Sequence, residues 1–299
     1  MKVVAVFVNL IYFLLLAPFL EGVMRKLTAW IQSRKGPPLY QPYLDLLKLL
    51  GKENLNSGGN WAFRLAPILS FSSMLAAIAL IPLTGQANIL AHSSDLMTLI
   101  YFLTLSGFCL LVGALGSGNP FAAVGASREM MTTVMLEPVL AMLLILGTVR
   151  IGSFSLSAAV SGVAVSRGVS YFLMLVVYLL ALQAFAARQP FDIAEAEVEI
   201  LEGPYMEYSG PNYALLRYTL NLKRMFYAWL LVSCFLSFIL PANFLFSLLL
   251  QTVLIIVVFI LISLIGATHP RFRIDQALKY YALLLILALI AVGLAVKGW

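Results

Sequence analysis

Charged residues are scarce in this chain. Only 11% of its 299 residues are Asp, Glu, Lys or Arg, whereas 62% are hydrophobic. Soluble domains carry roughly 25% charged residues, so this composition excludes an ordinary water-soluble fold. Several apolar runs reach or approach the ~20 residues that a helix needs to cross the core of a bilayer. The runs are continuous rather than alternating, which favours helices over a transmembrane barrel.

Cysteine and histidine are also rare. The chain has two cysteines, Cys109 and Cys234, and two histidines, His92 and His269, all far apart in the sequence. No CxxC pair is present, and an iron–sulfur cluster needs about four thiolates. We interpret the cysteines as small buried hydrophobic residues. We predict no metal site and no cofactor in this chain, so that any electron transfer would take place elsewhere.

Polar or Gly/Pro-rich stretches divide the apolar sequence into eight segments. They predict an all-α, polytopic membrane protein in which residues 1–299 form a single transmembrane domain. Two loops are long, at about 25–64 and 188–224. The expected spans are 3–24, 65–82, 95–115, 128–148, 169–187, 225–240, 244–267 and 279–297.

The basic residues indicate how these spans are oriented. Fifteen of the 19 Lys and Arg fall in alternate loops, namely the first, third, fifth and seventh. Cytoplasmic loops of membrane proteins carry an excess of Lys and Arg. We therefore expect the long loops in the cytoplasm and both termini on the outer side. The net charge of +6 then reflects membrane topology and does not indicate a nucleic-acid partner.

Glu21 lies near the cytoplasmic end of the first predicted span, with Arg25 four residues later. This spacing places both side chains on one face of a helix. The two residues could form an interfacial ion pair that anchors the end of the helix. Alternatively, Glu21 faces a polar cavity, because an ionisable group at membrane depth is costly unless it is used.

The first long loop contains a second charged pattern. The string Arg34-Lys-Gly-Pro-Pro ends a helix, and the leucines that follow alternate with Asp45, Lys48 and Lys52. This pattern predicts a short amphipathic helix at the membrane interface. The helix could anchor the loop to the surface or provide a docking ledge for a soluble partner.

Glu137 lies inside the apolar run of the fourth predicted span, beyond Arg128 and Glu129. A lone carboxylate there is costly to ionise, so we expect it to be neutral at times or paired with water or a base. The adjacent Pro138 interrupts the hydrogen-bond ladder of the helix, and freed carbonyl groups can hold water. Both features are what a proton relay needs.

The segment from Asp192 to Glu207 holds six of the 13 acidic residues of the chain. Pro190 and the Gly203-Pro204 pair are typical of the two ends of a helix. On that helix, Asp192, Glu195, Glu199 and Glu202 would form one stripe, because they are spaced 3, 4 and 3. Repulsion between like charges on one face should raise the pKa values of some of these acids, which would then share protons.

The alternative is a solvated acidic face balanced by basic residues, namely Arg188, Arg217, Lys223 and Arg224. Two further arginines, Arg271 and Arg273, are expected to be topology determinants.

Two of these segments together resemble the signature of one protein family. Residues 190–197 read Pro-Phe-Asp-Ile-Ala-Glu-Ala-Glu, and residues 207–210 read Glu-Tyr-Ser-Gly. In the first loop, the Arg34 string is followed by Gln-Pro at 41–42 and by Asp45, Lys48 and Lys52. The pattern is similar to the membrane subunit that joins the peripheral arm to the membrane arm in respiratory complex I. The match runs from Glu21 to about Arg224, with the same eight-span layout to the end.

This family has a branch that forms a quinone chamber and a branch that anchors a [NiFe] hydrogenase. Three details favour the hydrogenase branch, which includes formate hydrogenlyase and the energy-converting hydrogenases. The string Glu202-Gly203-Pro204 resembles the hydrogenase form. So does the run from Ser117 to Glu129, followed by Glu137 and its proline. The chain is also short for the complex I form.

The resemblance implies a non-catalytic membrane anchor and proton- or ion-coupling subunit in the inner (plasma) membrane of a prokaryotic cell. Protons would be reduced at a [NiFe] centre in a neighbouring soluble subunit, which iron–sulfur clusters supply with electrons. The expected partners are the hydrogenase large and small subunits and iron–sulfur subunits on the cytoplasmic side, antiporter-like membrane subunits and the lipid bilayer.

The resemblance also assigns candidate residues to a proton path. Matching positions place its acids at Glu21, Asp45, Glu137, Asp192, Glu195, Glu199, Glu202 and Glu207. The expected basic partners are Arg25, Arg34, Arg128, Arg217 and Lys223. Three alternatives stay open: a quinone-site subunit of a complex I-type oxidoreductase, a stand-alone transporter, and a passive scaffold that uses the acidic stripe only for docking. No internal repeat supports the transporter.

Overall fold

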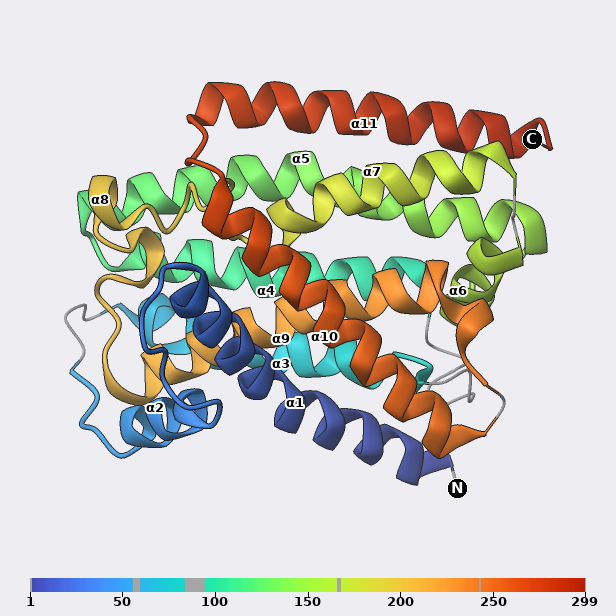
Figure 1. Cartoon of the computed structure of the whole chain (residues 1–299). Coiled ribbons are helices and arrows are strands. Elements are labelled where there is room, and N and C mark those ends of the chain that lie inside the picture. Colours follow the sequence, from blue (N-terminus) through green and yellow to red (C-terminus); the bar gives the residue numbers. More distant parts are fainter. Residues whose placement is uncertain (1, 56–59, 84–94, 166–167, 242, 299) are drawn as a thin grey trace.

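The computed structural model describes residues 2–55, 60–83, 95–165, 168–241 and 243–298, which form a helical bundle (Figure 1). Most helices run roughly along one axis, whereas α1 (Lys2–Ile31) and α10 (Phe244–Thr268) cross it obliquely. Within the described ranges there is no β-strand, apart from one isolated bridge between Asp95 and Ser155. The predicted all-α fold is confirmed.

Each of the eight predicted spans coincides at least in part with a helix, and six of these helices are long and apolar. Among the described residues, six helices are long and apolar enough to cross a bilayer, namely α1, α3, α4, α5, α10 and α11. The apolar α7 is shorter, and α9 carries three basic residues, Arg217, Lys223 and Arg224. Together with α7 and α9, the helices that correspond to predicted spans number about eight. The bounds are Trp61–Ala79 for α3, Leu96–Gly116 for α4, Pro120–Ile151 for α5, Val169–Phe185 for α7, Gly210–Phe235 for α9 and Ile274–Val296 for α11.

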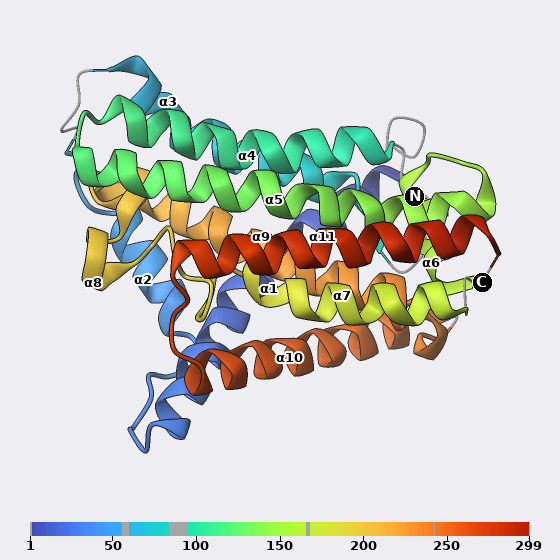
Figure 2. The same cartoon turned by 90° about the horizontal axis from the view of Figure 1, so that it is seen from above.

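The centre of the bundle is α9. It packs against α1, α2 (Gln41–Leu50), α3, α6 (Leu156–Val165), α7 and α10. Figure 2 shows α3 and α4 on one side of the molecule and α10 on the other. Almost every side chain of the second half of α9 is buried, and Trp229 and Phe226 are fully enclosed. Apolar packing on all sides explains why this helix keeps its place despite its three basic residues.

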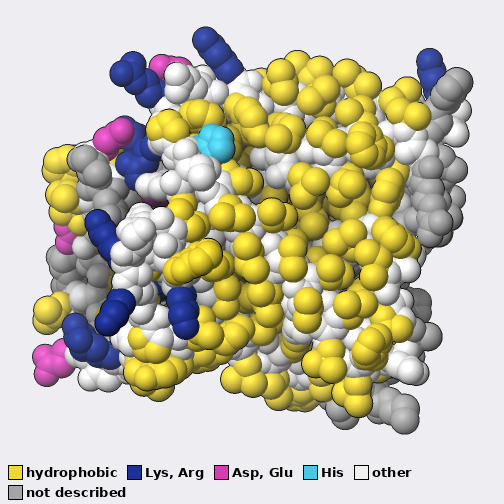
Figure 3. All heavy atoms as spheres, in the orientation of Figure 1, with side chains coloured by type: hydrophobic (Ala, Val, Ile, Leu, Met, Phe, Trp, Pro, Cys, Tyr) yellow, Lys and Arg dark blue, Asp and Glu magenta, His cyan; other side chains and the backbone are white. Residues whose placement is uncertain are grey.

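Charged side chains gather at one end of the bundle. Figure 3 shows Lys, Arg, Asp and Glu mainly at this end, whereas hydrophobic side chains cover most of the remaining visible surface. The two termini lie at the opposite end (Figure 1). A helix bundle with a wide apolar surface and one charged end fits a multi-pass membrane protein. That the charged end faces the cytoplasm stays a prediction.

Several helices are longer than predicted. The fourth predicted span is part of α5, which begins at Pro120, because Asn119 accepts a hydrogen bond from Phe121 N at 2.9 Å as an N-cap and proline suits the first helical position. Similarly, α9 begins at Gly210 and not at 225. The sequence argument placed its basic residues in a loop, but in the structure they lie inside the helix and pair with acids of other segments.

The predicted helix through the acidic segment is wrong. Between Arg188 and Ser209 the chain forms only the short α8 (Glu197–Ile200) and one 3-10 turn at Gly203–Tyr205. Leu201 and Glu202 have φ values of +50° and +69°, a left-handed conformation that ends a helix. The four acids therefore do not form one helical stripe.

Contacts with other elements fix this segment instead. Phe272 N donates a hydrogen bond to the carbonyl of Pro190 at 2.9 Å. The Phe191 ring packs against the rings of Phe272 and Tyr281, with centroids 5.3 and 5.5 Å away. The linker between α10 and α11 thus holds the start of the acidic segment, and tertiary packing overrides the helical pattern of its sequence.

The close approach of Gly125 in α5 to the acidic segment yields a test. A Cβ at this position would lie 2.6 Å from Gly203 Cα and 2.7 Å from Pro204 Cδ. We expect Gly125→Ala to lower the free energy of unfolding by about 1–3 kcal/mol, as overpacking does. Thermal unfolding of the purified protein in detergent measures this change.

Gly107→Ala in α4 is the matched control, since nothing lies within 4 Å of its added Cβ. We expect this variant to be at least as stable as the wild type, because alanine favours the helix. Equal melting temperatures for the Gly125 variant and the wild type would contradict the tight packing.

Candidate functional site

A buried carboxylate lies among three guanidinium groups at the charged end. Glu21 on α1 is 5% exposed. Its Oε1 lies 3.2 Å from Arg25 Nε and 2.6 Å from Arg188 Nη2, and its Oε2 lies 3.2 Å from Arg224 Nη1. Arg224 also donates a hydrogen bond to the carbonyl of Ala186 at 2.8 Å. The pairing of Glu21 with Arg25 is confirmed, and two partners come from distant segments.

The predicted amphipathic helix is present as α2, and it extends this cluster outward. Asp45 on α2 accepts hydrogen bonds from Arg25 Nη1 at 2.8 Å and from Gln41 Nε2 at 3.1 Å. A pocket of about 300 Å³ lies between α1, α2 and α9. Its lining includes Glu21, so the sequence-based alternatives of an ion pair and a carboxylate facing a cavity both apply. The charged lining residues are Glu21, Arg25, Asp45, Lys48, Lys52 and Arg217.

Arg217 on α9 gathers a second group of acids. Its Nη1 lies 3.9 Å from Glu195 Oε2, and its Nη2 lies 3.5 Å from Glu202 Oε1. Its Nε donates a hydrogen bond to the Tyr213 hydroxyl at 2.8 Å, and that hydroxyl donates to Glu202 Oε2 at 3.1 Å. Arg217 thus joins the acidic segment to the central helix. The sequence predicted it as a partner of these acids but placed it in a loop.

A small cavity connects the acidic segment with acids of the membrane-spanning region. It has a volume of about 40 Å³, whereas a water molecule needs about 10–15 Å³ by the same measure. Asp192 and Glu195 line it on the loop side. Glu129 and Glu137 of α5 and Lys223 of α9 line it within the bundle. The cavity is therefore large enough for a few water molecules between the two groups of acids.

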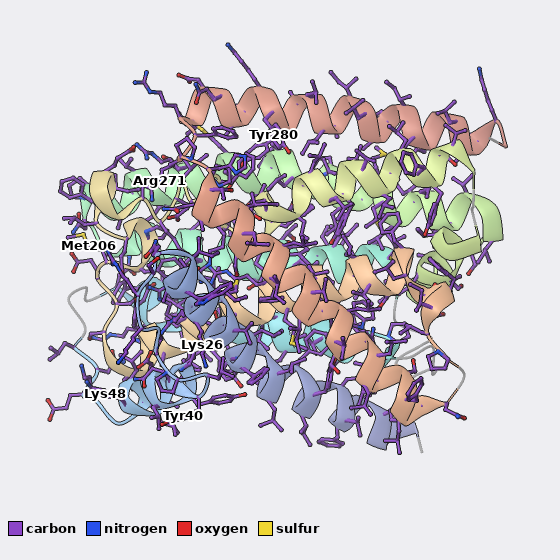
Figure 4. The ribbon with its side chains drawn as sticks, in the orientation of Figure 1. Lys26, Tyr40, Lys48, Met206, Arg271 and Tyr280 are labelled. Atoms are coloured by element: carbon purple, nitrogen blue, oxygen red, sulfur yellow. The ribbon has the colours of Figure 1, made fainter. Side chains whose placement is uncertain are left out.

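Two polar contacts describe the acids around this cavity. Lys223 Nζ lies 3.9 Å from Glu129 Oε1, whereas Glu137 has no ion-pair partner among the described residues. Arg271 Nη2 lies 2.9 Å from Asp192 Oδ2, and Figure 4 labels Arg271 at the charged end. The other oxygen, Asp192 Oδ1, is buried without a hydrogen-bond partner in the described part of the chain. Such an atom is a natural partner for a water molecule in the cavity.

The remaining predicted residues lie at the surface of the charged end. Glu199 is paired with Arg128, whose Nη1 is 2.7 Å from Glu199 Oε2. Glu207 accepts a hydrogen bond from Asn119 Nδ2 at 2.5 Å. Arg34 is exposed, and in the described ranges it forms no ion pair with any of these acids. The structure therefore gathers most of the predicted residues but leaves Arg34 apart.

The pKa values of Glu195 and Glu199, two acids of the segment, are shifted in opposite directions. Burial raises the pKa of Glu195 above its usual range, and the charges of Arg224 and Arg217 only partly offset this rise. The hydrogen bond from Arg128 lowers the pKa of Glu199. The sequence argument expected raised pKa values from mutual repulsion along one helix. The observed cause for Glu195 is burial, with Asp192 adding a smaller repulsive effect.

Several residues of the site were not selected from the sequence. Arg188 and Arg224 were expected only to balance an acidic face, and Arg271 only to set the topology. Glu129 was noted beside Arg128 but was not placed in the path. The signal that could have found them is the charge balance, because each buried acid needs a partner. Which cation serves which acid depends on contacts across the fold.

Cys109 and Cys234 are both buried and free, and His269 is exposed at the end of α10. His92 lies outside the described residues. Among the described residues, no group of three His, Cys, Asp or Glu side chains is arranged to hold a metal ion. What the site can do chemically is to exchange protons between carboxylates and water beside fixed positive charges.

A multi-pass membrane protein with buried carboxylates converging at one end defines the class of this chain. The sequence model of the NADH dehydrogenase family matches residues 3–296. The chain belongs to this family, and the resemblance to the membrane subunits of complex I and of the related hydrogenases is confirmed.

Relatives from both branches of the family are similar to the chain. It is 31% identical to formate hydrogenlyase subunit 4 of Escherichia coli (strain K12), over 87% of either protein. It is 34% identical to hydrogenase-4 component C of the same organism, over 87% of this chain and 85% of the relative. An NADH-quinone oxidoreductase subunit of Geobacter sulfurreducens is 34% identical over 70% of this chain and 69% of the relative.

A solved structure shares the whole fold. A chain of the membrane-bound sulfane sulfur reductase, an archaeal respiratory membrane complex, superposes with a TM-score of 0.83 at 29% identity. The likeness covers 97% of this chain and 99% of the other. The relatives are thus subunits or components of larger assemblies.

The Glu21 cluster predicts a large loss of stability when its carboxylate is removed. Glu21→Gln leaves Arg25, Arg188 and Arg224 close together without the central anion. Breaking a buried pair in this way costs about 3–5 kcal/mol. Denaturant or thermal unfolding of the purified protein measures this loss. Glu53→Gln removes an exposed carboxylate as the control, and an equal effect of both changes would exclude the special role of Glu21.

The raised pKa of Glu195 predicts a pH dependence of stability. The folded state binds this proton more tightly, so its contribution is greatest at low pH. It is lost as pH rises from the ordinary carboxyl value of about 4.3 through the raised pKa. Glu195→Gln stays neutral and should flatten melting temperature against pH in this window. The pKa of Glu199 is lowered, so its contribution to stability is lost as pH falls, and Glu199→Gln should remove that loss. Identical profiles of melting temperature against pH for the wild type and both variants would contradict the assignment.

Proposed function

We propose that this chain is the membrane anchor and the proton- or ion-coupling subunit of a complex I-like membrane-bound [NiFe] hydrogenase. The chain would supply no catalytic residue and no cofactor. Hydrogenase large and small subunits and iron–sulfur subunits would bind at the charged end, on the cytoplasmic side. They would carry the [NiFe] centre and the clusters. Antiporter-like membrane subunits would contact the apolar surface of the bundle.

The observation that supports coupling is the cavity between the acidic segment and the bundle. Its loop side is lined by Asp192 and Glu195, and its inner side by Glu129, Glu137 and Lys223. Water in such a cavity could pass a proton from one carboxylate to the next. The raised pKa of Glu195 favours a proton there at a pH at which an exposed carboxyl group has lost it.

The cluster around Glu21 gives a physical basis for communication with a docked partner. Asp45, Arg25 and Glu21 are linked by contacts of 2.8 and 3.2 Å, and Asp45 reaches the outer part of the site. Arg224 acts electrostatically on both Glu21 and Glu195. A change of charge near Asp45 would therefore alter the proton affinity of Glu195.

The quinone-site alternative depends on the pocket between α1, α2 and α9. Sites for apolar cofactors are lined predominantly by hydrophobic and aromatic side chains. This pocket is lined by six charged residues, by Tyr213 and Asn221, and by three apolar residues, Pro42, Leu46 and Leu49. An apolar ring placed there would desolvate several of the charges at a cost, which favours the hydrogenase branch.

The coupling role is tested by Glu137→Gln in the intact complex. Glutamine keeps the shape of the side chain but cannot release a proton, so transfer through the cavity should stop. We expect ion translocation per hydrogen evolved to fall by at least about tenfold, since proton transfer groups contribute about 10²–10⁴-fold. Hydrogen evolution and ion uptake, measured together in sealed vesicles, report this ratio.

Two further variants complete this test. Glu199→Gln removes the acid that is paired with Arg128 at the surface, and Asp275→Asn removes an exposed acid outside the cavity as a control. The control should keep the wild-type ratio. Wild-type hydrogen evolution and pumping in both the Glu137 and Glu199 variants would reject the relay. Co-purification of a large subunit with two CxxC pairs would support the nickel assignment.

A further inference from the structure

A groove on the outer side of α1 combines apolar and basic side chains. Its volume is about 670 Å³. Val23, Leu27 and Trp30 of α1 line one wall, and the returning loop contributes Gly36 and Leu39. Three cations complete the lining: Lys26, Arg34 and Lys35. The groove contains no acidic residue among those described and shares no lining residue with the charged pocket around Glu21.

None of these cations has an acidic partner in the described part of the chain. Lys26, Arg34 and Lys35 are each exposed, and none of them lies within ion-pair distance of a described carboxylate. Most other basic side chains of the charged end are paired with acids, such as Arg25, which bonds Asp45 and Glu21. The groove therefore carries three uncompensated positive charges and fits an anionic ligand.

The groove continues the apolar surface of the first helix. Phe7, Ile11 and Leu15 are 60%, 55% and 62% exposed, so this side of α1 faces the surroundings of the bundle. Lys26 follows Leu15 by 11 residues, about three helical turns and ~16 Å, and so lies on the same side. Figure 4 labels Lys26 near the charged end of the helix. The cations thus stand where the apolar stripe ends.

Trp30 lies beside these cations, near the end of the apolar stripe of α1. Its side chain is 77% exposed at the rim of the groove. Tryptophan is enriched at the boundary between hydrocarbon and headgroups, where its ring lies between apolar and polar surroundings. Lysine and arginine beside it are suited to a phosphate group, which arginine can bind through two hydrogen bonds.

We propose that this groove binds an anionic phospholipid. The phosphate lies against Lys26, Arg34 and Lys35, and one acyl chain follows Val23 and the apolar stripe of α1. This inference goes beyond the coupling function and is independent of it. An acidic segment of a partner protein would match the charges but leave the adjoining apolar stripe without an explanation.

Native mass spectrometry of the full-length protein provides the test. The protein is incubated with phosphatidylglycerol or with phosphatidylcholine of the same acyl chains, and the bound lipid is counted. We expect the wild type to retain the anionic lipid in preference. The variant Lys26→Gln/Arg34→Gln/Lys35→Gln should lose about tenfold or more of this preference, since each cation near an anionic headgroup contributes to binding. Equal retention of both lipids by the wild type would overturn the proposal.

A matched control removes three exposed cations elsewhere. Arg64→Gln/Lys279→Gln/Lys297→Gln changes the net charge by the same amount, and none of these residues lines the groove. It should keep the preference of the wild type. An equal loss in both triple variants would show only a general charge effect and would reject the site.

Fluorescence locates the lipid without changing a charge. Phosphatidylglycerol with brominated acyl chains should quench the wild type more than Trp30→Phe, because the bromine atoms lie near Trp30. Quenching that is the same in both proteins would overturn the assignment. A second outcome would also overturn it. If Lys26→Gln/Arg34→Gln/Lys35→Gln released peripheral subunits from the intact complex but bound lipid as the wild type does, the groove would be a protein contact.

Discussion

The burial of one carboxylate among three guanidinium groups is the constraint on which the charged end depends. Glu21 binds Arg25 on its own helix, Arg188 after α7 and Arg224 on α9. Burying any of these charges alone would be unfavourable, and only the assembled cluster is tolerable. The cluster thus requires α1, α9 and the chain just after α7 to come together, and it fixes their relative positions.

In the acidic segment, ion pairs with other elements hold an irregular backbone in place of the helix that its sequence pattern favours. Its acids reach Arg271, Arg217 and Arg128, which lie on three different elements. A continuous helix would point these acids in one direction and leave them to repel each other. An irregular path instead brings Asp192 and Glu199 each to a separate arginine, and Glu195 and Glu202 to a shared one, Arg217. The left-handed residues Leu201 and Glu202 are part of that path.

The same arrangement gives the acids of this segment different proton affinities. Glu195 is turned inward, where burial raises its pKa, whereas Glu199 is turned outward to Arg128, which lowers its pKa. A path that moves protons benefits from such differences, because groups with distinct proton affinities define where a proton rests. The small cavity beside Glu195 places this group within reach of the acids of α5.

Composition and hydrophobic runs were sufficient to predict the membrane class, the all-α fold and about eight spans, because long apolar segments have few alternatives in a bilayer. Local patterns also predicted the i,i+4 pair of Glu21 and Arg25 and the amphipathic helix α2. Motifs indicated the family before any geometry was known. The acidic helix was wrong, since its 3, 4 and 3 spacing is only a local preference.

Tertiary structure alone decided which charges meet. Two of the three partners of Glu21, Arg188 and Arg224, lie 167 and 203 residues away, and no local pattern links positions that far apart. The same holds for the pairing of Asp192 with Arg271 and for the cavity that joins Glu195 to Glu137. Sequence determines that buried acids need cations, because desolvation makes an unpaired charge unstable. Only the packing of the helices selects which cation reaches which acid.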